Sequence, residues 1–250
     1  MYFDKSFVYL VTMNFLIQTI GKKIKHDFSF ALIQSCEFNN WFRNNREFKY
    51  FLTEECVRPN VKKEYIPIGS VEFVSEYLQK YYGLTPKPKN VPVELMGREW
   101  SGRTILNGTE KDIIGEKFVK SNDKTKSFTE ICESAPEGNY QISDLIDIKS
   151  EWRAFIYKKG LVGLQNYSGD FCTFPDVDKI KGMIESYIHQ PIAYTLDVAV
   201  TNENNTVIIE VHDFFSCGLY GFSEHKILPY MFSNWFYYYI YNKSKNGKNS

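Results

Sequence analysis

The sequence lacks any excess of charge of one sign. Lys plus Arg and Asp plus Glu number 30 each in 250 residues, with 43% apolar and 24% charged residues, which is ordinary for a globular protein. Affinity for duplex nucleic acid comes from neutralising phosphates, so a neutral chain without a long basic block argues against such a partner. The length predicts one large domain or two small ones with a sizeable apolar core.

No stretch of the sequence is apolar for long enough to predict a membrane span. The most apolar stretch near the start, residues 7–20, contains Thr12, Asn14 and Gln18 and falls short of the roughly 20 apolar residues that a bilayer requires. It has only Lys5 as a basic flank and no small-residue cleavage site before Gly21, so a secretory signal is not indicated either.

Cysteines are few, odd in number and widely spaced. None of the five forms a C-x-x-C pair, which predicts neither a disulfide framework nor a zinc knuckle. The pattern fits a reducing compartment, and we therefore expect a cytoplasmic protein.

Short motifs of several enzyme classes are also missing. There is no G-x-x-x-x-G-K-[ST] phosphate loop and no protein-kinase set, and the residues after Lys120 are not the K-x-D-G of covalent nucleotidyl transfer. The four histidines form no H-E-x-x-H pattern, and there is no G-x-S-x-G nucleophile elbow. These absences exclude the corresponding nucleotide-binding, zinc-dependent and serine-dependent classes.

The first part of the chain alternates strand and helix patterns. Strands are predicted at 15–18, 48–52 and 66–68, and a helix over 28–42. Ser70 is a suitable N-cap for a helix that Gly83 ends. A proline-rich connector between Leu84 and Pro92 ends this unit. We therefore predict an N-terminal α/β domain at 1–90, of which residues 1–12 are interpreted as an extension.

Residues 91–250 are dominated by strand patterns. Strands are predicted at 117–120, 140–146, 152–157, 161–167, 193–200 and 207–212, with tight turns at 158–160 and 202–205 that favour antiparallel pairing. After Pro175, placed in a first helical turn, a helix is predicted to bury Ile180, Met183, Ile184, Tyr187 and Ile188. A closing helix is expected over 227–241, followed by a disordered polar tail from about 242.

The last predicted hairpin places acidic residues on one face. Strand alternation separates Asp197 from Tyr194, Leu196, Val198 and Val200, and it separates Glu210 and His212 from Val207, Ile209 and Val211.

If Val200 pairs with Val207 across the turn, Asp197 lies opposite Glu210. Two carboxylates so placed repel each other unless they share a proton or a cation. Their oxygens suit Mg²⁺ held jointly with substrate phosphates. The alternative is a solvated hairpin face with two unpaired acids.

Three basic residues are candidates for binding phosphate. Lys120 ends a strand and Lys126 follows it after a polar loop. Arg153 lies within an apolar strand, where it is either a surface arginine or a fork for phosphate or carboxylate. Taken one at a time, each lysine is equally consistent with an exposed surface position.

The order of these residues resembles the ATP-grasp superfamily. The resemblance is carried by Phe-Val-Lys at Lys120, a hinge at 143–147, Glu-x-Arg at Arg153, Asp197 and the Glu-Val-His that ends at His212. Segments 66–73, 120–128, 151–155, 194–198 and 218–221 are similar to a small phage-associated ATP-grasp clade. Together they cover residues 13 to about 222.

The resemblance implies an ATP-grasp fold of the α/β (α+β) class, with a pre-ATP-grasp domain at 1–90 and the ATP-grasp domain at 91–250. It implies an ATP-dependent ligase that joins a small-molecule or peptide carboxylate to an amine through an acylphosphate. Lys120 and Lys126 would hold phosphates, and Arg153 would steady the transferring phosphoryl group or the acylphosphate. The adenine slot would be lined by Ser143, Asp144, Leu145 and Asp147, and Mg²⁺ would be bound by Asp197, Glu210 and His212.

Two features depart from the family pattern. His212 stands where an E-x-N motif supplies an asparagine oxygen, so Mn²⁺ could replace Mg²⁺, His212 could lie outside the metal shell, or the enzyme could be weakened. The loop from Ser121 to Lys126 is also shorter than the usual phosphate-covering loop. A nucleotide-binding module without catalysis is therefore the alternative function. A third candidate, modification of nucleic-acid ends, is opposed by the neutral charge.

Overall fold

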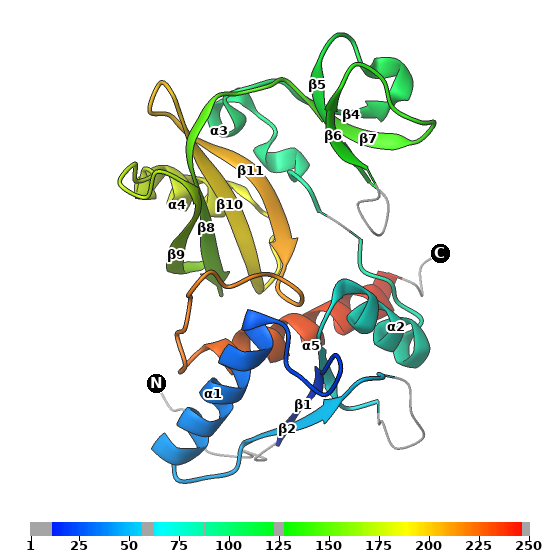
Figure 1. Cartoon of the computed structure of the whole chain (residues 1–250), viewed down its shortest axis with the longest axis vertical. Helices are drawn as coiled ribbons and strands as arrows, with labels where there is room; N and C mark the ends of the chain where they lie inside the picture. The colour runs from blue at the N-terminus through cyan, green and yellow to red at the C-terminus, as the bar shows by residue number, and fades with distance from the viewer. Residues whose placement is uncertain (1–11, 57–62, 88, 123–127, 247–250) are drawn as a thin grey trace.

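The computed structural model describes residues 12–56, 63–87, 89–122 and 128–246. These residues form three β-sheets that follow one another along the long axis of the molecule (Figure 1). Residues 1–11, which make up nearly all of the expected N-terminal extension, lie outside the described residues.

The N-terminal sheet is parallel, with the order β2-β1-β3. Its strands are β1 (Met13–Gln18), β2 (Phe48–Thr53) and β3 (Ile66–Ile68), and the helices α1 (Asp27–Phe42) and α2 (Val71–Tyr82) follow β1 and β3. Phe15 and Ile17 are fully buried, as expected for the central strand of a parallel sheet that is covered on both faces. The predicted alternation of strand and helix is confirmed.

The ends of α2 follow the predicted capping residues. The Ser70 hydroxyl accepts a hydrogen bond from the backbone N–H of Phe73 over 3.2 Å. Gly83 ends the helix in the left-handed conformation, at a φ of 68°, which a residue without Cβ adopts at little cost. Both caps could be predicted from the sequence because they are local.

The central sheet is antiparallel, with the order β11-β10-β8-β9. Its strands are β8 (Ile148–Tyr157), β9 (Gly160–Gly169), β10 (Ala193–Thr201) and β11 (Thr206–Asp213). Lys158 and Lys159 both have positive φ in the predicted turn between β8 and β9, as a two-residue hairpin connection requires. This sheet is the rigid platform on which most candidate site residues lie.

Helix α4 (Val177–Ser186) packs in the same core as the central sheet, but its predicted limits were wrong at both ends. Asp176 is the N-cap and accepts hydrogen bonds from the N–H groups of Asp178 and Lys179, so Pro175 precedes the helix. The helix ends at Ser186, which leaves Ile188 outside the buried stripe and 71% exposed.

The upper sheet is a small antiparallel sheet with the order β4-β7-β5-β6. Its strands are β4 (Ile105–Thr109), β5 (Lys117–Ser121), β6 (Thr129–Cys132) and β7 (Asn139–Ser143), preceded or joined by the short helices η1 (Val93–Leu95), α3 (Arg98–Ser101) and η2 (Glu110–Asp112). The strand predicted at 140–146 ends at Ser143. Residues 144–147 connect the upper sheet to β8.

The last helix, α5 (Leu228–Asn246), returns to the N-terminal sheet. Its buried residues Phe232, Trp235 and Phe236 belong to the same apolar cluster as Leu32 and Tyr77. The prediction of a disordered tail from about 242 was wrong for 242–246, which continue the helix, and 247–250 lie outside the described residues. The domain boundary near residue 90 stays a prediction.

Among the helices of the described residues, none combines the length and the apolar character that crossing a bilayer requires.

Replacing Ser70 by Ala removes the hydroxyl that caps α2. We expect the free energy of unfolding to fall by about 1 kcal/mol, because the Phe73 N–H loses its acceptor. Ser75→Ala, the same change inside α2, is the control and should leave stability unchanged or slightly higher. Urea unfolding of the three proteins measures the difference, and equal midpoints for the two variants would contradict the assignment.

Candidate functional site

The upper and central sheets enclose a cavity of about 440 Å³. One side of its lining is apolar and includes Phe118, Ile131, Leu145, Ile148 and Ile209. The other side carries Arg103, Lys120, Glu151, Tyr167 and Glu210. An apolar slot beside converging charged groups is typical of a small-molecule site, here of a size that suits a planar ring attached to an anionic group.

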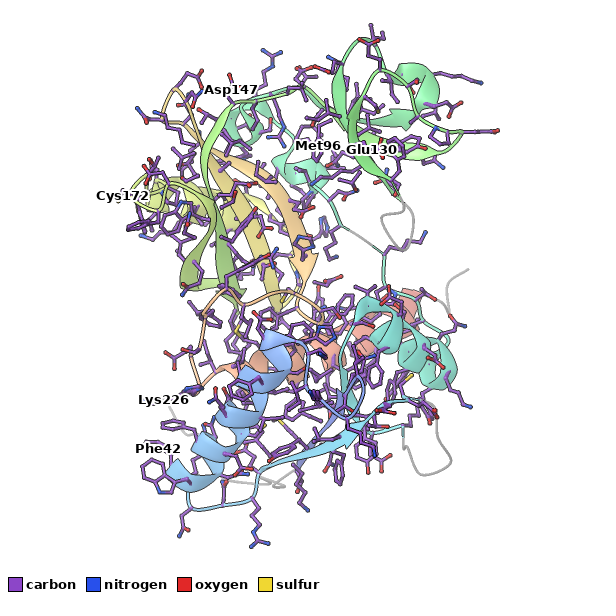
Figure 2. The ribbon with its side chains drawn as sticks, in the orientation of Figure 1. Phe42, Met96, Glu130, Asp147, Cys172 and Lys226 are labelled. Carbon is purple, nitrogen blue, oxygen red and sulfur yellow. The ribbon has the colours of Figure 1, made fainter. Side chains whose placement is uncertain are left out.

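The predicted hinge residues reach this cavity in part. Ser143, Asp144 and Leu145 line it. Asp147 does not: its side chain is exposed at the top of β8 (Figure 2), and its backbone carbonyl accepts a hydrogen bond from the N–H of Asn202. The adenine slot proposed for 143–147 therefore reduces to the first three of the predicted residues, together with Ile146.

Asp144 ties the hinge to the other connection of the upper sheet. Its carboxylate accepts hydrogen bonds from Lys117 Nζ over 2.7 Å and from the Thr104 N–H over 3.2 Å, and its own N–H donates to the Thr104 carbonyl. The hydrogen bond from Lys117, followed by that from Thr104, lowers the pKa of the Asp144 carboxyl. Asp144 thus serves the geometry of the hinge with its side chain.

Asp197 and Glu210 are cross-strand neighbours on β10 and β11, as predicted. The pairing assumed at the turn was wrong, because Val200 pairs with Thr206 and a β-bulge next to Asp197 restores the register. The bulge also reverses the side chains beyond it. Ile208 belongs to the apolar core, whereas Ile209, which alternation placed there, lines the cavity.

The acidic pair lies within a chain of alternating charges. Arg153 donates from Nε and Nη2 to the two oxygens of Asp197 over 2.8 and 2.7 Å. His212 Nε2 lies 3.5 Å from Asp197 Oδ2 and 2.6 Å from Glu210 Oε1, and Lys120 Nζ lies 2.8 Å from Glu210 Oε2. The interpretation of this hairpin as a solvated face with unpaired acids is therefore wrong.

Burial and pairing act in opposite directions on these groups. Burial favours the neutral form of Asp197, but hydrogen bonds from Arg153 and His212 outweigh it and lower the carboxyl pKa. Burial also disfavours the charged forms of Arg153 and His212, and their hydrogen bonds to the carboxylates raise both pKa values. Asp197 is only 2% exposed, so its charge depends on these partners.

The side chains of Asp197, Glu210 and His212 can share one metal ion. One ligand atom from each lies within 4.8 Å of the others. Two carboxylate oxygens suit Mg²⁺ or Mn²⁺, and the imidazole nitrogen shifts the preference towards Mn²⁺. Because Arg153 engages both oxygens of Asp197, a shared ion would use the remaining lone pairs of that carboxylate.

Arg103 is a site residue that the sequence analysis missed. It is 7% exposed and lines the cavity, and its Nη1 donates to the carbonyl groups of Ser101 and Ile208 over 3.0 and 2.9 Å. Burial lowers the pKa of its guanidinium to about 10, against the opposing effect of Asp144. Such a buried cation indicates an anionic ligand. Its sequence context, Ser-Gly-Arg-Thr, contains no motif that could have identified it.

Glu151 and Tyr167 were also missed as cavity residues. The Tyr167 hydroxyl donates to Glu151 Oε1 over 3.2 Å, and burial raises the pKa of this phenol. Of the residues proposed for phosphate binding, Lys120 lies at the cavity wall and Lys126 lies outside the described residues.

These features are shared with a known class of proteins: the chain is an ATP-grasp protein. A family model described as an ATP-grasp domain, the second family of its clade, matches residues 100–229, slightly more than half of the sequence. The chain belongs to this family, which confirms the resemblance seen in the sequence. The match spans the upper sheet, the central sheet and the beginning of α5. A comparison with curated proteins gives no match.

Solved structures share the fold at low sequence identity. The D-cycloserine synthetase DcsG matches with a TM-score of 0.57 and 9% identity, covering 87% of this chain and 98% of its own. A RimK domain ATP-grasp protein from Sphaerobacter thermophilus gives 0.52 and 12%, covering 88% and 99%. N5-carboxyaminoimidazole ribonucleotide synthetase from Thermotoga maritima gives 0.51 and 10%, covering 89% and 76%. These likenesses establish the mixed α/β ATP-grasp fold.

Replacing Lys117 by Met should raise the pKa of Asp144 towards its ordinary value, because the largest cause of the lowering is removed. A carboxyl with a lowered folded-state pKa stabilises the protein above its unfolded-state pKa and loses that contribution as the pH falls through the folded-state value. Wild type should therefore be more stable than the variant at pH 7, and the difference should shrink below about pH 4.

Carbon-13 titration of the Asp144 carboxyl and unfolding curves at several pH values measure both effects. Lys80→Met, at an exposed position on α2, is the control and should change neither. An unchanged Asp144 titration in the Lys117 variant would contradict the assigned cause.

Proposed function

We propose that this ATP-grasp protein is an ATP-dependent ligase that joins a carboxylate to an amine through an acylphosphate. The observation that carries the proposal is the convergence of Lys120, Arg153, Asp197, Glu210 and His212 on one wall of the cavity between the two sheets. Acidic groups for a divalent ion, cations for phosphates and an apolar slot for a base occur together there. This is the combination that phosphoryl transfer from ATP requires.

The nucleotide would occupy the cavity with its base in the apolar slot. Backbone groups of the hinge at Leu145 and Ile146 border this slot beside Phe118 and Ile148. Lys120 and Arg103 would bind phosphate oxygens, and Lys126 remains a third proposed phosphate ligand. Both described cations lie within the buried part of the wall, where a charge-assisted hydrogen bond is stronger than in water.

Asp197, Glu210 and His212 would hold Mg²⁺ or Mn²⁺. Such an ion neutralises phosphate charge when bound. The strands fix the three ligands because Asp197 and Glu210 are paired in the β-ladder and His212 follows two residues later on the same face. Lys120, already on Glu210, lies where it can bind both a metal-ligating carboxylate and a phosphate oxygen.

Arg153 would stabilise the transferring phosphoryl group. In the reaction, a carboxylate oxygen forms a bond to the γ-phosphorus while the bond to ADP breaks. An amine then forms a bond to the carbonyl carbon of the acylphosphate, with loss of phosphate and a proton. Fixed positive charge at the phosphoryl oxygens lowers the first barrier, and Asp197 holds the Arg153 guanidinium in place for this role.

A second candidate is a nucleotide-binding module without catalysis. It is favoured by the engagement of both Asp197 oxygens by Arg153 and by a histidine at position 212. Both candidates share the same nucleotide site, so turnover distinguishes them.

The five cysteines are free thiols in the structure, which supports the further proposal of a reducing, cytoplasmic environment. We propose small-molecule or peptide carboxylates and amines as substrates.

Glu210→Gln tests the ligase proposal. Wild type with ATP, Mg²⁺ or Mn²⁺ and a panel of acids and amines should release ADP and phosphate. The variant should be slower by about 100-fold or more, because a neutral amide at position 210 neither binds the ion well nor pairs with Lys120. Glu203→Gln, an identical change at the exposed β10–β11 turn, should keep full activity.

Three results decide between the candidates. Equal activity of the two variants would contradict the role of Glu210. Tight ATP binding by wild type without turnover under either metal would support the binding module. Absence of any nucleotide binding would reject both.

Arg103→Met tests the missed cation. The Kd for ATP should rise about 10- to 100-fold, the equivalent of one hydrogen bond to a charged group, whereas the affinity for adenosine should stay the same. Arg43→Met is the control: Arg43 pairs with Glu47 after α1, away from the cavity, and should leave both affinities unchanged. Calorimetric titration measures the four values, and an equal loss of adenosine affinity would contradict a phosphate-binding role.

A further inference from the structure

The turn between β11 and α5 contacts both the N-terminal part of the chain and the candidate site. The Ser216 hydroxyl donates to the Gly69 carbonyl over 2.6 Å, next to the start of α2. Phe222 stacks on Phe155 of β8, with ring centres 4.2 Å apart. The turn from residue 216 to residue 222 is therefore fixed at both ends, and its middle lies between α1 and Arg153.

Asp27 holds the middle of this turn from the N-terminal side. Its Oδ2 accepts hydrogen bonds from the consecutive N–H groups of Leu219 and Tyr220, over 2.7 and 3.2 Å. Tyr220 has a φ of 49°, in the left-handed region that a residue with a side chain seldom adopts. Consecutive amides in such a bend form a small concave site for an anion. Here the anion is the Asp27 carboxylate, which compensates the strained backbone.

Arg153 holds the same turn from the other side. Its Nη1 donates to the Gly218 carbonyl over 3.0 Å, while Nε and Nη2 donate to Asp197. Its guanidinium carbon also lies 5.0 Å from the centre of the Tyr220 ring. Asp197 alone leaves the guanidinium free to rock about the axis of their ion pair. The Gly218 carbonyl is a third acceptor, on a different element, that restricts this motion.

We propose that Asp27 is a positioning residue that orients Arg153 through the Gly218–Tyr220 turn. The proposal rests on the proposed function in one respect, that Arg153 serves phosphoryl transfer. The two ends of the connection are adjacent in the turn: Asp27 fixes the N–H of Leu219, and Arg153 binds the carbonyl of Gly218, the other half of the same peptide group. Asp27 thus links the first helix of the N-terminal domain to the catalytic centre.

This connection predicts which property changes when the Asp27 charge is removed. The bond from Ser216 to Gly69 and the Phe222–Phe155 stack keep the ends of the turn in place, so the fold and the nucleotide cavity should persist. Only the middle of the turn and the orientation of Arg153 should change. We therefore expect a slower reaction with unchanged binding of ATP.

Asp27→Asn and Asp176→Asn form a matched pair for the kinetic test. Both aspartates accept backbone N–H groups at the start of a helix, Asp27 in α1 and Asp176 in α4, but the hydrogen bonds of Asp176 stay within its own helix and the neighbouring Thr206. For Asp27→Asn we expect kcat for ADP release to fall about 10-fold, with KM for ATP within about 2-fold of wild type. Asp176→Asn should change neither. An equal fall of kcat in both variants would overturn the proposal.

A second measurement decides the proposal whether or not the protein turns over ATP. The Nε–H of Arg153, assigned in NMR spectra through its loss in Arg153→Lys, should exchange with solvent about 10-fold faster in Asp27→Asn and at the wild-type rate in Asp176→Asn. Asp27→Ser, which retains an oxygen at the start of α1 but has no charge, serves if Asp27→Asn does not fold.

An unchanged Arg153 signal in the folded Asp27 variants would overturn the positioning role. Faster exchange in a wild-type background that neither binds nor consumes ATP would support the positioning of Arg153 by Asp27 while rejecting the proposed function.

Discussion

The buried ion pair between Arg153 and Asp197 is the interaction on which the candidate site depends. Asp197 is 2% exposed, and an isolated carboxylate at that depth would be strongly destabilising. The two residues are direct partners in the β8–β10 ladder, so their geometry is set by the backbone of two adjacent strands. With the guanidinium bound to both carboxylate oxygens, the next carboxylate, Glu210, is accommodated by His212 and Lys120.

This chain of charges also connects the three parts of the molecule. Lys120 comes from the upper sheet, Arg153, Asp197 and Glu210 come from the central sheet, and Asp27 reaches the Arg153 side from the N-terminal helix α1 (Figure 1). A change in the position of any one part therefore alters the electrostatic environment of the others. Groups on paired strands are held more rigidly than groups on loops, which suits a site that must bind a triphosphate in one orientation.

Local elements of the fold were predictable because their causes lie within a few residues. The Ser70 and Gly83 caps, the turn at 158–160 and the buried run of β1 depend on neighbours in the chain. Errors arose where a distant packing partner decides the outcome. Helix α5 continues beyond 241 although its sequence becomes polar, and the β-bulge in the last hairpin exchanges Ile208 and Ile209 between core and cavity.

The sequence by itself determined the facing of Asp197 and Glu210, because alternation along two strands joined by a short turn limits their relative positions, and the order of motifs determined the family. Only the tertiary structure decided what neutralises those acids and which further cations serve the cavity. Arg103 reaches the carbonyl of Ile208, and Asp27 reaches the amide of Leu219, across separations of 105 and 192 residues. Contacts over such separations depend on how sheets and helices pack, and no local pattern of residue types encodes them.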